Sequence, residues 1–410
     1  MPKTIAIIGA GAAGTFAAAN LPKSDAYRVL LFEKTGKALQ KVRASGGGRC
    51  NVTHQLFDIP ELIERYPRGP RWLKKTLHRF GPQQTIDWFE KRGVSIVGEA
   101  DGRMFPETNS AETIAMAIWE TALRNGTEVR FHHKLEALQR VGEHWKLTFG
   151  GHEPVLADAV LITTGGSPQL SGFNLLQTLG HTIASPVPSL FTFNMPGNPI
   201  IALMGVSVPE AIVRISGTKI ETTGPLLITH WGMSGPAILR ASAWGARELA
   251  DRAYQFTISV NWVPGLDEAS LKAKFVQLRQ QDGRQSVGGK NPFDLPKRLW
   301  QFFLQTCGVA EDATWATLEA APQRKLLEKL IRDPYTVSGK TTFKEEFVTS
   351  GGVSLKEVSP ETLESRLHPG IYFAGEVLDV DGITGGFNFQ HAWASGWLAA
   401  AAMAATSSQS

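Results

Sequence analysis

The sequence predicts an α/β protein whose parallel sheet is interrupted by a long insertion. Three short apolar runs carry this prediction: Ile5–Ile8, Ala159–Gly166 and Gly370–Glu376. Each run is typical of a strand that is buried on both faces, and each leads into glycine or other small residues. The chain between residues 186 and 342 has a different pattern, so we expect it to leave the sheet and return.

A glycine-rich turn follows the first strand. Gly9, Gly11 and Gly14 have the spacing G-x-G-x-x-G. The first glycine allows a tight turn, the second lets backbone approach a pyrophosphate, and the third lets the next helix pack close to the sheet. Ala12 and Ala13 open that helix, whose free N–H groups and dipole favour a bound phosphate.

The second strand, Arg28–Phe32, ends at Glu33 and Lys34. A carboxylate about twenty residues beyond the glycine turn is suited to accept hydrogen bonds from ribose hydroxyls, and it disfavours a 2′-phosphate. The next segment contains three successive glycines from Gly46 to Gly48, which suit a backbone lying flat against a ligand. A flexible surface loop is the alternative interpretation of this segment.

The remaining pattern predicts the following elements in chain order. Two amphipathic helices with a Gly81–Pro82 break span Pro60–Arg92, and a strand candidate lies at Val94–Val97. A helix at Ala111–Asn125 has Ser110 as its N-cap, and Trp145–Phe149 belongs to a small antiparallel meander. Short strands fill Pro186–Val263, a helix begins at Pro236, and Leu266–Arg332 is helical. Strand character resumes at Phe347–Ser354.

We therefore expect a Rossmann-like domain formed by residues 1–188 and 343–410. Residues 189–264 form an inserted β-rich domain, with 334–350 as a candidate completion, and residues 265–333 form an inserted helical domain.

Composition narrows the possible functions. The net charge is +4, and we interpret the basic run Arg71–Lys75 as a solvated helix face rather than a nucleic-acid patch. Two cysteines, Cys50 and Cys307, provide neither a metal-binding set nor a disulfide framework. With no signal peptide and no membrane-length apolar run, we expect a cytoplasmic protein without membrane or nucleic-acid partners. The oligomeric state stays open.

Five motifs resemble those of the BaiN-like or YhiN-like NAD(P)/FAD-dependent oxidoreductases, which include aminoacetone oxidase-like enzymes. They are IIGAGAAG (7–14), SGGGRCNVT (45–53), THWGMSGPAIL (229–239), TSGGV (349–353) and YFAGEVLDVDGITGGFNFQHAWASG (372–396). The resemblance implies FAD, a split Rossmann-like domain, and inserted β-barrel-like and helical domains. The residues that it places against FAD are Gly9, Gly11, Ala12, Ala13, Gly14, Glu33, Lys34, Arg43, Ser45, Gly46, Asn51, Leu135, Thr164, Gly165, Gly375, Glu376, Gly386, Phe387 and Asn388.

The expected activity is FAD-dependent oxidation or reduction of a small organic substrate, either reduction of an activated double bond or oxidation of an amine. A flavin-dependent RNA-modifying protein and a non-catalytic flavin-bound sensor are the alternatives. NADH or NADPH is a candidate transient hydride donor, because the sequence has a single complete dinucleotide fingerprint. His230 is the candidate catalytic acid or base, with a hydrogen-bonded structural histidine as the alternative. The helix that opens near Asn388 is expected to direct its N–H groups towards the flavin.

Overall fold

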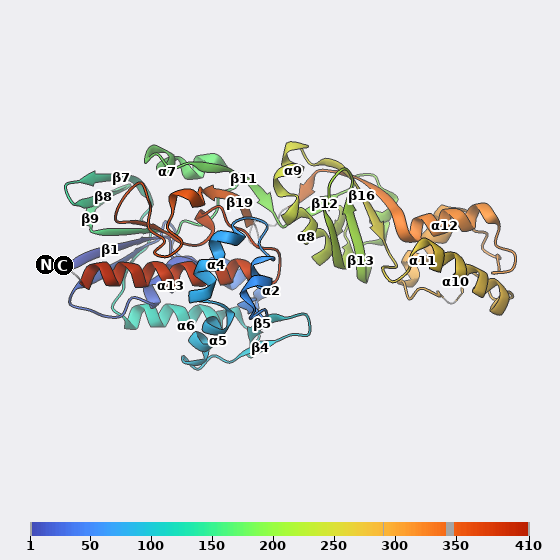
Figure 1. The fold of residues 1–410 in the computed structure, drawn as a ribbon, viewed down its shortest axis with the longest axis horizontal. Helices are drawn as coiled ribbons and strands as arrows, with labels where there is room; N and C mark the ends of the chain where they lie inside the picture. The colour runs from blue at the N-terminus through green and yellow to red at the C-terminus, as the bar shows by residue number, and fades with distance from the viewer. Residues whose placement is uncertain (1, 290, 342–347, 409–410) are drawn as a thin grey trace. The chain divides into compact units, whose positions relative to one another are not determined.

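The computed structural model describes residues 2–289, 291–341 and 348–408. The chain divides into two compact units, the first made of residues 1–189 with 343–410 and the second of residues 190–342. Figure 1 shows both units and labels many of their elements.

A parallel sheet of five strands organises the first unit, in the order β20-β10-β1-β2-β6. Its strands are β1 (Lys3–Ile8), β2 (Tyr27–Phe32), β6 (Glu128–Arg130), β10 (Ala159–Ile162) and β20 (Ile371–Phe373). Val160 of β10 pairs with Ile371 of β20, so a strand that follows the insertion completes the sheet. The predicted interrupted sheet is confirmed, and its apolar runs are buried.

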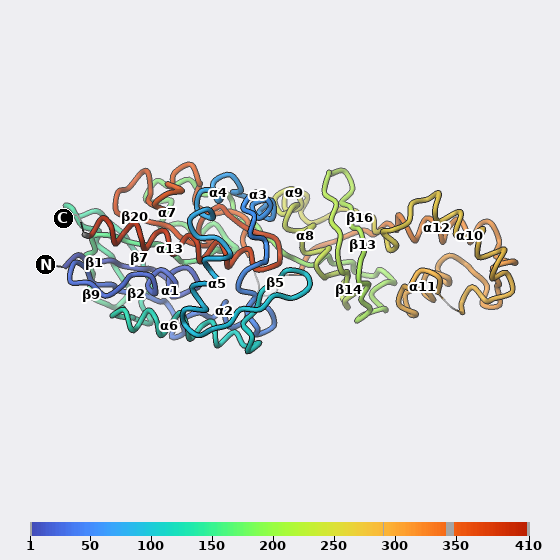
Figure 2. Tube along the Cα trace, turned by 60° about the horizontal axis from the view of Figure 1, so that its bottom comes forward, coloured from blue at the N-terminus to red at the C-terminus, as the bar shows by residue number. Residues whose placement is uncertain are grey.

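Two helices from opposite ends of the chain pack together in this unit: α1 (Ala12–Ala19) and α13 (Phe387–Ser408). Figure 2 shows them side by side. A Cβ atom at Gly396 would lie 2.6 Å from the Ala13 carbonyl oxygen, so glycine permits this close packing. Helix α6 (Ala111–Arg124) also packs against α1; Ser110 is its N-cap residue, but its side chain makes no capping hydrogen bond.

The segment around Pro60–Arg92 contains three helices, and the predicted number of two is wrong. These are α3 (Ile59–Ile63), α4 (Pro70–Arg79) and α5 (Pro82–Glu90). Gly69 has φ +78°, a left-handed conformation that favours glycine and separates α3 from α4. The predicted break at Gly81–Pro82 is confirmed, because α5 begins at Pro82.

Smaller elements complete the first unit. A meander of β7 (Leu135–Val141), β8 (His144–Phe149) and β9 (His152–Ala157) confirms the predicted one. Strands β3 (Thr53–His54), β4 (Ile96–Gly98) and β5 (Arg103–Pro106) form another sheet, and β11 (Ile183–Ser189) pairs with β19 (Val348–Val353). Helix α2 (Gln40–Gly48) lies between β2 and β3 in sequence, and α7 (Asn174–Thr178) lies between β10 and β11. Phe347, the predicted start of the returning strand, lies outside the described residues.

The second unit contains a seven-stranded antiparallel sheet, five α-helices and a 3-10 helix (Pro199–Leu203) within its described residues. In chain order the strands are β12 (Thr192–Asn194), β13 (Ser207–Ile215), β14 (Glu221–Ile228), β15 (Gly232–Ser234), β16 (Gln255–Asn261), β17 (Asp333–Ser338) and β18 (Lys340–Thr341). The helices are α8 (Pro236–Trp244), α9 (Ala246–Asp251), α10 (Glu268–Gln281), α11 (Lys297–Cys307) and α12 (Ala320–Arg332). One apolar cluster joins sheet and helices.

Candidate functional site

The turn after β1 forms a cradle at the carboxyl edge of the parallel sheet. Gly9 has φ +111°, and a Cβ there would lie 2.5 Å from the Thr163 carbonyl oxygen. A Cβ on Gly14 would overlap the Gly9 carbonyl oxygen, so both positions require glycine. Gly11 differs, because a Cβ there would meet nothing within 4 Å. Space is therefore left beside the first turn of α1, where a pyrophosphate is expected.

Glu33 is held at the end of β2 by both of its carboxylate oxygens. Oε2 accepts from the Ala10 amide at 3.0 Å, and Oε1 accepts from the Thr35 amide and hydroxyl at 2.9 Å each. The His133 amide donates to the Glu33 carbonyl, which brings the segment leading to Leu135 beside this residue. Lys34 is exposed. The contact with Ala10 places the carboxylate in the glycine cradle, where a ribose hydroxyl could bind.

Glu33→Ala should weaken FAD binding about ten- to a hundredfold, because a charge-assisted hydrogen bond contributes about 1.5–3 kcal/mol. Fluorescence titration of apoprotein measures this affinity. Thr35→Val is the matched control, since it removes a bond that holds the carboxylate but leaves the carboxylate itself. Equal affinity in Glu33→Ala and the wild type would place the ribose elsewhere.

The glycine-rich segment forms a left-handed turn at the end of α2. Ser45 is extended, whereas Gly46, Gly47 and Gly48 have φ values of +58°, +67° and +84°. Cβ atoms at Gly47 and Gly48 would meet nothing within 4 Å. Arg43 is predicted to face the cofactor; in the structure its guanidinium binds Glu112 of α6 at 2.6 and 3.0 Å, and its role at the cofactor stays a prediction.

Two further turns lie at the carboxyl ends of β10 and β20. Thr164 and Gly165 follow β10, and a Cβ on Gly165 would meet nothing within 4 Å. Gly375 and Glu376 follow β20, and a Cβ on Gly375 would lie 2.8 Å from that of Ala13. These turns therefore border the same edge of the sheet as the α1 cradle.

Glu376 has both carboxylate oxygens occupied by protein groups. Oε1 accepts from the Thr349 amide at 2.8 Å, and Oε2 pairs with Lys41 Nζ at 2.7 Å. Glu376 therefore links α2, through Lys41, to the returning strand β19, through Thr349, beside the predicted cofactor-binding turns.

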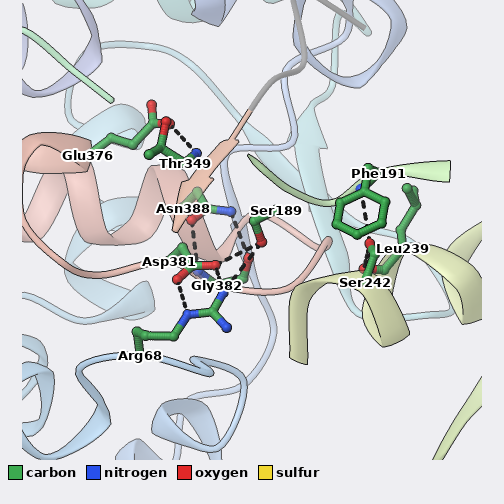
Figure 3. Close-up of polar contacts among 10 residues, drawn as sticks. All are labelled: Arg68, Ser189, Phe191, Leu239, Ser242, Thr349, Glu376, Asp381, Gly382 and Asn388. Atoms are coloured by element: carbon green, nitrogen blue, oxygen red, sulfur yellow. Dashed lines mark hydrogen bonds and ion pairs between the residues drawn. The ribbon is translucent and has the colours of Figure 1, made fainter. Parts of the chain in front are cut away.

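The loop of residues 379–386, which leads into α13 and is called the clamped loop below, is fixed at three points. Figure 3 draws two of them, the contacts of Asp381 and of Asn388. Asp381, fully buried, accepts two hydrogen bonds from the Arg68 guanidinium and one from the Ser189 hydroxyl at 2.8 Å. The Asn388 side chain accepts from the Gly382 amide at 2.8 Å and donates to its carbonyl at 3.0 Å. Asn51 accepts from the Gly386 amide at 3.0 Å in the amide orientation that satisfies its donors and acceptors.

The clamped loop fixes the start of α13, because Tyr66 also donates to the Phe387 carbonyl at 2.7 Å. Sequence reasoning predicted Asn51, Gly386, Phe387 and Asn388 as neighbours of the cofactor, and the structure brings them together. Sequence reasoning did not predict the Arg68–Asp381 pair, whose members are 313 positions apart. Asp381, the second aspartate of the DVDG motif (379–382), was the available signal in the sequence.

Burial shifts the pKa of three groups in this unit. It raises the pKa of Cys50 to about 12 and lowers that of His391 to about 4. Burial raises the pKa of Asp381 above its usual value, and the neighbouring Arg68 guanidinium opposes part of that rise. His391 is therefore neutral at pH 7; its Nε2 donates to the Gly375 carbonyl.

Cys50→Ser should retain FAD and keep the rate of flavin reduction by an artificial electron donor within about tenfold. A dithiol relay needs a paired low-pKa thiol, whereas Cys50 is buried and protonated. Flavin absorbance and steady-state rates provide the measurement, with Cys307→Ser as the matched control. Loss of flavin turnover in Cys50→Ser alone, with FAD still bound, would assign chemistry to this thiol.

His230 lies in the second unit, in the turn between β14 and β15. Its side chain is exposed, and its ring centroid lies 3.9 Å from that of Trp231. The Thr229 amide donates to the Gly232 carbonyl at 2.8 Å and closes this turn. The role of His230 stays a prediction.

Neither a metal site nor a membrane span is visible in the described part of the chain. Those residues contain no group of three or more His, Cys, Asp or Glu side chains that could hold a metal ion. They also contain no helix that is long and apolar enough to cross a bilayer.

The fold and the cradle together define a Rossmann-type protein that binds a dinucleotide cofactor. The family model described as "HI0933-like protein Rossmann domain" matches residues 3–402. The chain therefore belongs to the HI0933-like Rossmann family, which confirms the resemblance to BaiN-like or YhiN-like flavoproteins. It is a flavin-dependent oxidoreductase.

Individual proteins show similarity over nearly the whole chain. The "Ribosomal RNA dihydrouridine synthase" of Escherichia coli is 32% identical over 96% of each chain. The "3-dehydro-bile acid delta(4,6)-reductase" of Clostridium scindens is 27% identical over 98% of each. A solved 3-ketosteroid-delta4-(5alpha)-dehydrogenase from Rhodococcus jostii has a TM-score of 0.50 and 14% identity, covering 97% of this chain and 96% of its own, and shares the fold.

Proposed function

We propose that the protein uses bound FAD to reduce a carbon–carbon double bond conjugated to a carbonyl group. The observation that carries this proposal is the chemistry common to the two full-length relatives. Dihydrouridine is uridine with its ring double bond saturated, and a delta(4,6)-reductase of a 3-dehydro substrate acts on double bonds conjugated to a ketone. This comparison favours reduction over amine oxidation, which the sequence left open.

The residues of this chain would bind and orient the cofactor, which supplies a hydride when bound and reduced. The Gly11 cradle and the amino terminus of α1 would hold the pyrophosphate, and Glu33 the ribose. The clamped loop would fix the first turn of α13, whose N–H groups stabilise negative charge on reduced flavin. NADH or NADPH would supply the electrons as a transient donor.

The test is anaerobic stopped-flow mixing of the photoreduced holoprotein with 2-cyclohexen-1-one and, separately, with uridine-containing RNA. Reappearance of oxidised-flavin absorbance, together with the saturated product by mass spectrometry, is the expected result. Amines that bleach the oxidised flavin, with no conjugated alkene reoxidising the reduced flavin, would contradict the proposal.

His230 is proposed as the group that protonates the second carbon of the double bond. His230→Ala should leave FAD content unchanged and lower turnover about a hundredfold, because a positioned general acid contributes at least that much. Flavin absorbance and steady-state rates with the alkene measure both properties, and Trp231→Phe controls for disruption of the turn. Unchanged turnover would remove His230 from the chemistry.

A second candidate substrate is a uridine within RNA. The specific observation is the relative named as a ribosomal RNA dihydrouridine synthase, which is 32% identical along nearly the whole of both chains. The expectation of no nucleic-acid partner was drawn from composition alone. Incubation with deproteinised bacterial ribosomal RNA and nucleoside mass spectrometry would detect dihydrouridine, and its absence would restrict the substrate to small molecules.

A further inference from the structure

We propose that the exposed face of α4 binds the sugar–phosphate backbone of RNA and holds a nucleotide beside the clamped loop. This inference rests on the second candidate substrate and names the surface that would recognise it. We call this surface the α4 basic face; it consists of Arg71, Lys74, Lys75, His78 and Arg79.

The helical repeat brings these five residues to one side of α4. Their spacing is i, i+3, i+4, i+7 and i+8, and each is exposed, whereas Leu73, Thr76 and Leu77 on the other side are buried. The helix PRWLKKTLHR contains no acidic residue. Its ten residues span about 15 Å, enough for the cations to meet phosphates of successive nucleotides.

Most of the positive charge on this face is uncompensated. Lys75 pairs with Glu361 at 2.6 Å, and Arg79 donates to the Glu361 carbonyl at 3.4 Å. Among the residues that the structure describes, Arg71, Lys74 and His78 have no ion pair or hydrogen bond from their side chains.

Two other charged helices of the chain, α10 and α12, carry acidic and basic side chains that pair with each other. Helix α10 pairs Glu268 with Lys272, and α12 pairs Arg324 with Glu328, each at i,i+4 spacing. Such alternation of sign is typical of a solvated helix face. The α4 basic face lacks it, and a helix face rich in Lys and Arg with few acidic partners complements a polyanion.

The start of α4 is attached to the clamped loop. Arg68, two residues before α4, pairs with Asp381, and a Cβ on Gly69 would lie 2.8 Å from Val380 Cγ2. Helix α4 also packs against α13 in Figures 1 and 2. A phosphate backbone on the α4 basic face would therefore pass the same loop that fixes the amino terminus of α13.

The experiment is filter binding of holoprotein to deproteinised bacterial ribosomal RNA across a range of salt concentrations. Arg71→Glu/Lys74→Glu should lower affinity at least about tenfold near 0.1 M salt and reduce the slope of log K against log[salt] by about two. Lys23→Glu/Lys91→Glu is the matched control, because it makes the same change in net charge at exposed lysines outside α4. Flavin absorbance verifies that each variant keeps its cofactor.

Equal losses in the α4 variant and its control would overturn the proposal, because only net charge would then matter. Binding of wild-type protein to phosphatidylserine vesicles but not to RNA, lost in the α4 variant, would also overturn it in favour of a lipid surface. The assay needs no turnover, so it is independent of the proposed reaction. Alkene reduction together with unchanged RNA binding by the α4 variant would reject this inference alone.

Discussion

Gly14→Ala should prevent stable folding of the nucleotide-binding unit, whereas Gly11→Ala should leave the protein folded and remove its cofactor. A Cβ at Gly14 would overlap the Gly9 carbonyl oxygen and crowd the Thr163 hydroxyl, both fixed by the parallel sheet. Backbone cannot yield as a flexible side chain does, so we expect a loss of about 3 kcal/mol or more in the free energy of unfolding. A Cβ at Gly11 would meet no protein atom within 4 Å.

The alanine at position 11 would instead occupy the space through which a pyrophosphate approaches the backbone. FAD affinity should fall at least about a hundredfold, while the unfolding free energy of the apoprotein changes by less than about 1.5 kcal/mol, the scale of an N-cap effect. Urea denaturation and FAD titration measure the two quantities. Gly11→Ala protein that binds FAD like the wild type would show that the cofactor does not lie against this turn.

Breaking the Arg68–Asp381 pair should be the most destabilising change to a polar contact in the first unit. The Asp381 side chain is 0% exposed and that of Arg68 is 11% exposed, so removing either leaves a charge largely out of water. Asp381→Ala and Arg68→Met should each cost about 3–5 kcal/mol, whereas the apolar double variant Arg68→Met/Asp381→Leu should recover most of that loss. Urea denaturation of the wild type and these three variants measures the free energies of unfolding.

The exposed pair Lys75–Glu361 supplies the control, because its side chains are 62% and 49% exposed. Lys75→Met should change stability by no more than about 1 kcal/mol. Equal effects of Asp381→Ala and Lys75→Met would contradict the assigned burial of the Arg68–Asp381 pair. FAD affinity measured on the same proteins would show how far the clamped loop prepares the cofactor site.

The spacing of three glycines along the chain predicted the strand–turn–helix geometry of the cradle. The roles of Gly9, Gly11 and Gly14 depend on a turn between one strand and the next helix, so a dozen residues contain the necessary information. The interrupted sheet was also predictable, because its strands have a buried apolar pattern on both sides of the insertion. By contrast, α3 and α4 were merged into one helix because the left-handed Gly69 turn is short and its flanks are both amphipathic.

Contacts between distant segments were not predictable. Arg43 was assigned to the cofactor from its place beside the glycine-rich loop, and that assignment stays a prediction; its ion pair with Glu112 is a contact that local pattern does not identify. The Arg68–Asp381 pair was not predicted from the sequence for the same reason. The basic run at Arg71–Lys75 was visible as a charge pattern, yet only the structure shows which of its cations lack acidic partners.

Identification of the released cofactor tests the central claim most directly. Purified protein should be yellow, and heat-released cofactor should elute as FAD on HPLC in an amount equal to the protein. The cradle at Gly11 and the carboxylate of Glu33 predict this result, because they are placed for the pyrophosphate and ribose that FMN lacks. An FMN peak, or no bound flavin after reconstitution with FAD, would contradict the account.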